Sequence, residues 1–249
     1  MPVAIAAVAG LVTGSFFNVV IARLPRRESL LRPGSRCPHC GHPVRPYDNV
    51  PVFSWAILRG HCRDCGEPIS ARYPLVELVT AALFAAVVID TGANEHVWLG
   101  LALVSVLVPV AVIDFDQRII PNAILLPGAV AAVAILAATE PSKLPEHLIA
   151  GAAAGGFLLL AVLAYPRGMG MGDVKLAAVL GLYLGRSVGP AMLVALLSGA
   201  VVGAAIIARK GAREGRKTAV PFGPFLALGG LVGLFFGPEI VGWYLDAFT

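Results

Sequence analysis

Long uninterrupted runs of apolar residues constrain this chain more than any other feature. Hydrophobic residues make up 57% of its 249 residues, and they fall in runs of about 20, the length that spans a hydrocarbon core of about 30 Å as a helix. Charged residues are only 14%, against about 25% in a soluble domain, and the mean hydropathy is +0.81. These features exclude an ordinary soluble domain and predict an all-α polytopic membrane protein.

The hydropathy pattern predicts about eight transmembrane helices. They are expected at about residues 3–22, 73–91, 97–113, 122–139, 147–165, 174–185, 188–208 and 222–246. The first is expected to be a retained helix rather than a cleaved signal peptide, because its basic cluster follows the apolar run instead of preceding it. We expect three parts: transmembrane helix 1 at 1–22, a small zinc-binding cytoplasmic insertion at 23–72, and a helical bundle at 73–249 that carries both candidate catalytic aspartates.

Lys and Arg residues lie mostly on one side of this predicted topology. With the N-terminus outside, the inside segments are 23–72, 114–121, 166–173 with the adjoining Lys175, and 209–221, and they hold 17 of the 19 Lys and Arg residues. Only Lys143 and Arg186 remain outside. Because cytoplasmic loops retain basic residues, we predict an N-terminus outside and the polar insertion in the cytoplasm.

The four cysteines form two Cys-x-x-Cys pairs in the insertion. Cys37 and Cys40 are separated by 21 residues from Cys62 and Cys65, and a glycine directly follows each pair. This spacing is a strong zinc signature. Two disulfides or four unrelated thiols are the alternatives, and a reducing compartment disfavours the disulfides. Four protein ligands leave no open position, so we predict a structural zinc that stabilises an insertion without its own core.

Two aspartates are predicted at one membrane depth. Asp114 ends the third span at the inner face, and Asp173 begins the sixth span at the same face. Ionisable groups at the edge of a bilayer are costly unless solvated or paired, and they indicate function. Two close carboxylates supply the base and the acid of aspartic peptide hydrolysis, because like charges in proximity do not both ionise easily. Gly170 and Gly172 remove side chains where an extended substrate would approach.

Position alone leaves other interpretations of these aspartates open. Asp114 is also explained as a helix-terminal carboxylate at the water boundary. Asp173 is also explained as a first-turn carboxylate that the helix dipole stabilises. Asp116 competes with Asp114, since it lies two residues further along and on a different face of a continuing helix.

Further motifs follow in order along nearly the whole chain. They are Gly14-Ser15-Phe16-Phe17-Asn18-Val19-Val20-Ile21-Ala22-Arg23-Leu24-Pro25, both cysteine pairs, Tyr47-Asp48-Asn49-Val50-Pro51, Arg72-Tyr73-Pro74-Leu75-Val76-Glu77, the two aspartate segments, and Pro221-Phe222-Gly223-Pro224-Phe225. As a set they resemble the type IV prepilin leader peptidases, the bacterial members of the GxGD membrane aspartic protease group.

The resemblance implies a role for each aspartate. In that family the first catalytic aspartate lies seven residues before the proline of an Asp-x6-Pro-Asn motif, which here is Asp114 with Pro121 and Asn122. The second is the Gly-x-Gly-Asp aspartate, Asp173, so the resemblance decides for Asp114 over Asp116. It implies a multi-pass enzyme of the bacterial inner membrane, with its active site at the cytoplasmic face. Its substrates would be type IV prepilins or type II secretion pseudopilins, cut after a short basic leader.

A second activity also follows from the resemblance. Many bacterial members with this cysteine-bearing loop methylate the new N-terminus with S-adenosylmethionine. Glu77 and Asn18 are the candidates for a polar methyltransferase pocket, although helix-end solvation or interhelical hydrogen bonding also explains them. We expect prepilin or pseudopilin precursors and membrane lipid as partners, and no nucleic acid.

Two functions of other classes stay open. A zinc-loop membrane assembly scaffold explains the cysteines but not the aspartates. An ion- or proton-coupled transporter would place its carboxylates near the midplane and repeat its two halves, whereas the aspartates are predicted at the inner boundary.

Overall fold

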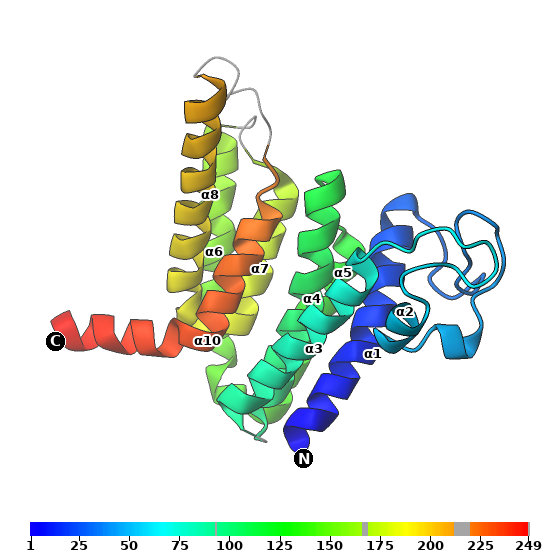
Figure 1. The fold of residues 1–249 in the computed structure, drawn as a ribbon. Helices are drawn as coiled ribbons and strands as arrows, with labels where there is room; N and C mark the ends of the chain where they lie inside the picture. The colour runs from blue at the N-terminus through cyan, green and yellow to red at the C-terminus, as the bar shows by residue number, and fades with distance from the viewer. Residues whose placement is uncertain (93, 166–168, 212–219, 249) are drawn as a thin grey trace. The chain divides into compact units, whose positions relative to one another are not determined.

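The computed structural model describes residues 1–92, 94–165, 169–211 and 220–248, and most of them lie in helices (Figure 1). Strands are absent from these four ranges, where the only sheet-like pairings are two isolated antiparallel bridges, Arg36 with Pro43 and His61 with Pro68. The chain separates into two compact units, Met1–Val97 and Trp98–Thr249, and each is described by itself.

The first unit is built on two antiparallel helices, α1 (Pro2–Arg23) and α3 (Arg72–Thr91). Their backbones approach closely because glycines face the contact. A Cβ atom at Gly10 would lie 2.6 Å from the Cα atom of Ala81, and one at Gly14 would lie 2.7 Å from the Cα atom of Glu77. Small residues serve the same purpose in membrane helices generally, where close packing replaces water exclusion as the driving force.

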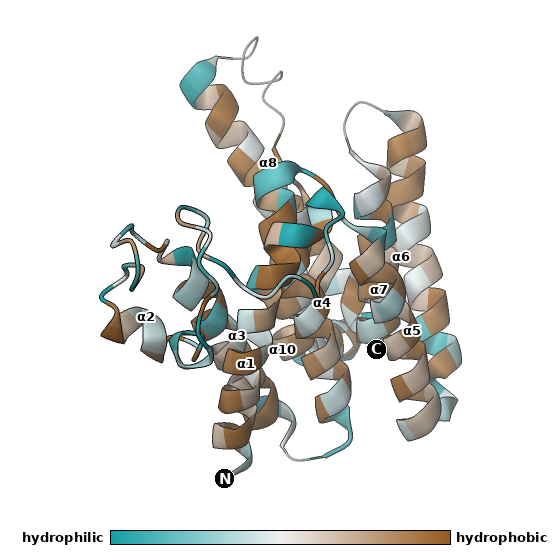
Figure 2. Ribbon diagram, turned by 90° about the vertical axis from the view of Figure 1, so that its right-hand side faces the viewer, coloured by the Kyte–Doolittle hydropathy of each residue, from teal (hydrophilic) through white to brown (hydrophobic). Residues whose placement is uncertain are grey.

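The polar insertion joins α1 to α3. It contains only short helices, η1 (Leu24–Arg26), η2 (Pro46–Asp48) and α2 (Phe53–Ile57), connected by loops. Figure 2 shows hydrophobic residues along the long helices and mainly hydrophilic residues in the insertion around α2. The apolar side chains that the insertion does contain are not buried, so it has no hydrophobic core of its own.

In the described residues, the second unit is a bundle of six long helices. They are α4 (His96–Gln117), α5 (Asn122–Thr139), α6 (Leu144–Ala164), α7 (Met171–Leu184), α8 (Val188–Lys210) and α10 (Gly223–Phe248). The chain reverses at η4 (Gly185–Ser187), so α8 returns antiparallel to α7 (Figure 1). Helix α10 runs parallel to α7, with Gly230 against Leu180 and Gly233 against Leu184. Leucines and valines from these helices fill the core between them.

Each of the eight predicted spans coincides with a long helix, which confirms the all-α polytopic membrane fold. Seven helical stretches of the described residues have the length and composition to cross a membrane, since α7, η4 and α8 together form one stretch, Met171–Lys210. Helix α7 has 14 residues and rises about 21 Å, less than the roughly 30 Å of a hydrocarbon core. Parts of two predicted inside segments, 166–168 and 212–219, lie outside the described residues.

Candidate active site and metal centre

Asp114 lies near the end of α4 and caps the start of α10. Its side chain is buried, with 5% of the residue exposed, and its Oδ2 atom accepts a hydrogen bond of 2.8 Å from the backbone N–H of Gly223. The first N–H groups of a helix have no partner within the helix and carry partial positive charge, so they stabilise a carboxylate. A Cβ atom at Gly223 would lie 2.7 Å from this oxygen, so the contact requires glycine.

Asp173 occupies the first turn of α7 and is held in a similar way. It is 8% exposed, and its Oδ2 atom accepts a hydrogen bond of 3.0 Å from the N–H of Gly170. Its own N–H donates to the carbonyl of Gly170 over 3.1 Å. Both aspartates are thus buried carboxylates that bind backbone amides at the N-terminus of a helix.

The two aspartate segments are in direct contact with each other. Lys175 donates a hydrogen bond of 3.0 Å from Nζ to Oδ1 of Asn122. Close to it, a Cβ atom at Gly172 would lie 2.9 Å from the Cβ atom of Ile120, so Gly172 makes room for Ile120 in this structure. The Asp-x6-Pro-Asn and Gly-x-Gly-Asp segments therefore meet at one end of the bundle.

The carboxylates of Asp114 and Asp173 lie at the same end of the bundle, because the segments that carry them are in contact. In the described residues, no hydrogen bond joins the two carboxylates. Each carboxylate accepts a hydrogen bond from a backbone amide instead. Asp116, the rival for the first position, is exposed. The structure thus brings together two buried acids at one end of the second unit, the arrangement from which aspartic hydrolysis can proceed.

The four cysteines form a separate cluster in the first unit. Their sulfur atoms all lie within 4.8 Å of one another, and Sγ of Cys37 is 3.8 Å from Sγ of Cys65. Four thiolates bound at about 2.3 Å to a tetrahedral zinc ion lie about 3.8 Å apart, so the donor set fits such an ion. All four cysteines are free, and the two-disulfide alternative is not the arrangement observed.

The two cysteine pairs adopt the same turn. In the first pair, the N–H of Cys37 donates to the carbonyl of His42, and the carbonyl of Cys37 accepts from the N–H of Gly41. In the second pair, the N–H of Cys62 donates to the carbonyl of Glu67, and the carbonyl of Cys62 accepts from the N–H of Gly66. The glycine after each pair has a left-handed backbone, with φ of 71° at Gly41 and 72° at Gly66. Hydrogen bonds from the backbone N–H groups of Cys40 and His39 lower the pKa of the Cys37 thiol to about 6. A backbone hydrogen bond from Glu67 lowers the pKa of the Cys65 thiol, but desolvation and hydrogen bonds to the other cysteines outweigh it and raise that pKa to about 12. Without a metal, the thiols of the cluster therefore do not all ionise alike.

Two exposed ion pairs connect the segments around the cysteine cluster. Arg63 binds Asp48 through both carboxylate oxygens, at 2.6–3.1 Å, and its Cζ atom lies 5.6 Å from the ring centre of Tyr47. Arg45 binds Asp64 at 3.0 Å. The hydrogen bond from Arg63 holds the pKa of Asp48 below its ordinary value.

Glu77 and Asn18, the candidates for a second polar pocket, both bind the backbone of the first unit. Asn18 donates from Nδ2 to the carbonyl of Tyr73 over 3.1 Å. Glu77 accepts from the N–H of Val52 over 2.7 Å. Both residues are buried. The interhelical hydrogen bonding considered as an alternative explanation accounts for Asn18, whereas Glu77 contacts the insertion.

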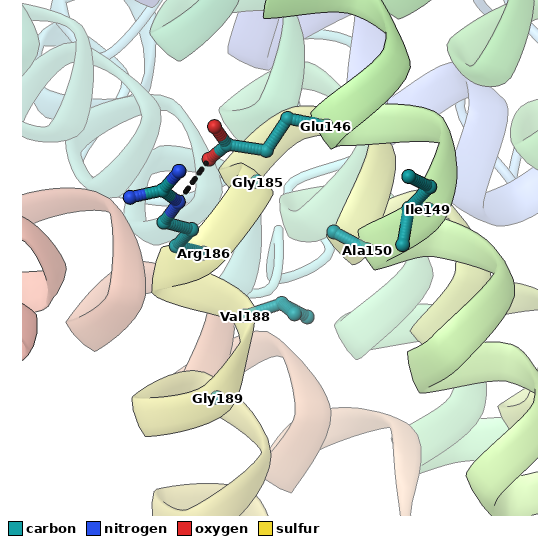
Figure 3. A pocket seen from close by; sticks show the side chains of 7 residues that line it. All are labelled: Glu146, Ile149, Ala150, Gly185, Arg186, Val188 and Gly189. Atoms are coloured by element: carbon teal, nitrogen blue, oxygen red, sulfur yellow. Dashed lines mark ion pairs between the residues drawn. The ribbon is translucent and has the colours of Figure 1, made fainter.

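A groove of about 600 Å³ lies at the other end of the bundle (Figure 3). Ile149, Ala150 and Val188 line it, beside an ion pair of 3.1 Å between Arg186 and Glu146. The groove begins where α7 ends at Gly185, about 18 Å along that helix from Asp173. It contains none of the candidate site residues and is therefore separate from the two aspartates.

Two family models and several known proteins match long parts of this chain. The model of the bacterial peptidase A24 N-terminal domain matches residues 8–91, and the model of the type IV leader peptidase family matches residues 101–208. A relative from Aeromonas hydrophila, named prepilin leader peptidase/N-methyltransferase, is 37% identical over 269 residues, covering 96% of this chain and 92% of the relative. The chain belongs to the type IV leader peptidase family. No solved structure matches it.

Other members of the type IV leader peptidase family with the same name have a similar sequence identity to this chain. One from Myxococcus xanthus is 42% identical over 219 residues, which is 85% of this chain and 64% of the relative. One from Bacillus subtilis is 36% identical over 241 residues, which is 95% of each chain. The shared name favours the peptidase interpretation over the scaffold and the transporter.

Two contacts at the site of this leader peptidase family member were not anticipated from its sequence. The Pro221-Phe222-Gly223 segment supplies the amide that binds Asp114. The sequence indicated this segment only as part of the family motifs, without a partner. Lys175 binds Asn122, and its spacing from Asp173 gave no indication of that partner. The basic segment before Pro221 was a usable signal, since it predicts that this motif returns to the face where Asp114 ends.

Proposed function

We propose that this chain is a membrane aspartic endopeptidase that removes the short basic leader from type IV prepilins or type II secretion pseudopilins, with Asp114 and Asp173 as its catalytic pair. The observation that carries the proposal is that these two acids, distant in sequence, are both buried at one end of the second unit and are both bound by helix N-terminal amides. The names of the relatives supply the substrate class.

The pair supplies both proton transfers of peptide hydrolysis. One ionised carboxylate takes a proton from water, while the other, protonated, donates to the oxygen of the scissile carbonyl. The water oxygen then adds to the carbonyl carbon. As the tetrahedral diol collapses, the C–N bond breaks, the departing nitrogen takes up a proton from the pair, and one hydroxyl of the diol returns its proton to the pair as the new carboxyl group forms. Both roles belong to the pair as a unit.

We propose that the enzyme lies in the bacterial inner membrane with its N-terminus outside. The concentration of Lys and Arg in the insertion and near the aspartate segments supports this orientation, since cytoplasmic loops retain basic residues. It places the insertion and the pair of aspartates in the cytoplasmic half. There they would meet the leader of a substrate whose hydrophobic helix lies in the bilayer.

The four cysteines are proposed to hold a structural zinc ion. The fit of their sulfur atoms to a tetrahedral ion supports this assignment. Zinc would crosslink the two halves of an insertion whose apolar side chains are not buried, and a site with four protein ligands leaves no position for substrate.

The N-methyltransferase part of the relatives' name supports a second proposed activity, methylation of the new N-terminus with S-adenosylmethionine. The first unit is its proposed location, with Asn18 and Glu77 near the site. In this structure Nδ2 of Asn18 binds the carbonyl of Tyr73, and Oε2 of Glu77 binds the N–H of Val52. We therefore derive no step of the methyl transfer from them.

Cleavage of a purified prepilin in lipid tests the peptidase. Asp114→Asn and Asp173→Asn are each expected to lower the cleavage rate by about 10²–10⁴-fold, the usual contribution of a general acid or base. The exposed Asp116→Asn variant serves as the control and is expected to cleave normally. Product mass, recorded with S-adenosylmethionine present, detects a gain of one methyl group.

The same measurement separates the alternatives. A scaffold or transporter would show no cleavage by the wild type. Normal cleavage by either of the two buried variants, with unfolding temperatures matching the wild type, would contradict the assignment of the pair.

A further inference from the structure

Glu77 is a buried carboxylate that the proteolytic mechanism does not use. It lies on α3, where that helix packs against α1, and only 7% of the residue is exposed. Its Oε2 atom accepts a hydrogen bond of 2.7 Å from the N–H of Val52. A carboxylate in such a place needs partners, and the main partner here belongs to the insertion.

That partner, Val52, has an unfavourable backbone conformation. Its φ is 63° and its ψ is −51°, and the N–H of Phe53 donates to the carbonyl of Pro51 over 2.6 Å. These are the marks of a γ-turn with positive φ at its central residue, a rare and strained type. Positive φ is a genuine outlier for a β-branched residue, so surrounding contacts must hold it in place.

Through Val52, the turn connects the insertion to Glu77 on α3. It falls between the two cysteine pairs in sequence and directly precedes α2. Ser54 fixes the approach to it, accepting the N–H of Val50 over 3.0 Å and donating to the carbonyl of Tyr47 over 2.8 Å. On the helix side the buried contact is Glu77. Movement of this turn would therefore move the segment that joins the two metal-binding pairs.

We propose that Glu77 is a positioning residue: its carboxylate holds the Pro51-Val52-Phe53 turn on the α1–α3 helix pair and thereby fixes the cysteine insertion in place for methyl transfer. The effect on methyl transfer rests on the proposed second activity, whereas the clamp on the turn does not. Holding an N–H requires an acceptor oxygen and no charge, which distinguishes this role from that of a carboxylate that contacts a cofactor or acts as a base.

Amide hydrogen exchange at Val52 measures the clamp directly, using the full chain in lipid nanodiscs. In Glu77→Ala the Val52 amide loses its acceptor, and we expect it to exchange at least about tenfold faster, as for the loss of one hydrogen bond. Glu77→Gln keeps an acceptor oxygen, and we expect its exchange to stay within about threefold of the wild type. The exposed Glu28, changed to Ala and to Gln, gives the matched controls. Unchanged exchange in Glu77→Ala would overturn the clamp.

Methyl transfer to a leaderless prepilin tests the consequence. We expect Glu77→Ala to lower kcat about tenfold or more with little change in KM for S-adenosylmethionine, and Glu77→Gln to restore it. Equal loss in both variants would mean that the negative charge itself is required, and would overturn the positioning role. If the wild type transfers no methyl group, the proposed second activity fails, while Val52 exchange still decides the clamp.

A second-site variant guards against simple misfolding of Glu77→Ala. Glycine adopts positive φ without steric cost, so Val52→Gly should keep the turn in place without its clamp. We expect the Glu77→Ala, Val52→Gly protein to recover most of the lost methyl transfer, and the matched Glu77→Ala, Val52→Ala protein to recover little. Equal recovery in the two proteins would contradict the proposal.

Discussion

The aspartate end of the second unit and the cysteine insertion of the first unit are both made of segments distant in sequence, but they are held by different forces. The aspartate end is part of a packed bundle, where glycines allow close contact and helix N-termini bind the two buried carboxylates. The insertion has short helices, exposed ion pairs and four thiols around a common centre. The aspartate end is held by packing, whereas the insertion is held by polar contacts and, as proposed, by a metal ion bound to its four thiols.

This difference predicts different sensitivities. A packed contact fails when one methyl group is added, because the interior has no room for it. A metal-held loop tolerates surface substitutions but fails when the metal leaves. Since the two proposed activities are assigned to different units, each kind of change should affect one activity and spare the other.

Metal removal should have the largest effect. Zinc bound by four cysteines contributes most of the folding free energy of a small metal-held segment, so a strong chelator is expected to lower methyl transfer by about 100-fold or more. Cleavage of the leader by Asp114 and Asp173 should change much less. The measurement is both activities on one nanodisc preparation, with metal content determined by mass spectrometry.

Readdition of zinc is the control for this experiment and should restore methyl transfer. If the chelator abolished cleavage as strongly as methyl transfer, the two units would depend on each other. That outcome would contradict the expectation that metal removal affects only the activity of the first unit. Serine in place of Cys62, which removes one ligand without a chelator, should reproduce the result.

Adding one methyl group beside Asp114 should produce the opposite pattern. In Gly223→Ala the new Cβ atom would lie 2.7 Å from Oδ2 of Asp114, so the carboxylate must move. Misplacement of a catalytic group by about 1 Å can cost about 10²-fold, and we expect cleavage to fall about 10–100-fold. Methyl transfer to a leaderless prepilin, assayed in parallel, should be unchanged, and loss of both activities would indicate general unfolding instead.

The sequence predicted those parts of the molecule that depend on local pattern. Apolar runs located all eight long helices, because membrane spans must be apolar along their whole length. The Cys-x-x-Cys-Gly spacing predicted the cluster of four thiols that the structure forms, since the turn at Gly41 and Gly66 is local chemistry.

Local sequence patterns did not predict the contacts between distant segments. Asp114 and Asp116 differ by two positions, and only the packed bundle shows that the first is buried and the second exposed. The amide of Gly223 reaches Asp114 across 109 positions, and Val52 reaches Glu77 across 25. No local preference encodes either contact; the strained φ of Val52 even opposes its β-branched side chain.

The unfolding free energy of glycine variants tests how much close helix packing stabilises the second unit. A Cβ atom at Gly181 would lie 2.5 Å from the carbonyl oxygen of Ala150 on the neighbouring helix α6, and overpacking of this kind costs about 1–3 kcal/mol. Gly181→Ala is therefore expected to lower the unfolding free energy by that amount. Gly156→Ala is the matched control, because a Cβ atom there meets nothing within 4 Å, and its effect should stay within about 0.5 kcal/mol. Equal destabilisation by both would show that helix propensity, not packing, sets the response.

The smallest effect is expected at the ion pair of Arg63 and Asp48, which stabilises the exposed insertion. Exposed pairs contribute little, so Asp48→Asn should speed proteolysis of the zinc-loaded insertion less than about fivefold. Arg63 lowers the pKa of Asp48, so the stabilisation is complete above the unfolded pKa of about 4 and is lost as the pH falls through the lower folded value.

Proteolysis of the two proteins at different pH and salt therefore checks this last expectation. The ratio of their rates should stay constant between about pH 6 and about pH 8. It should shrink towards one at about 1 M salt, where the screening length falls to about 3 Å. A ratio that stays unchanged at high salt would mean that Asp48 acts through hydrogen-bond geometry rather than charge. The insertion would then resemble the packed bundle in how its contacts stabilise it.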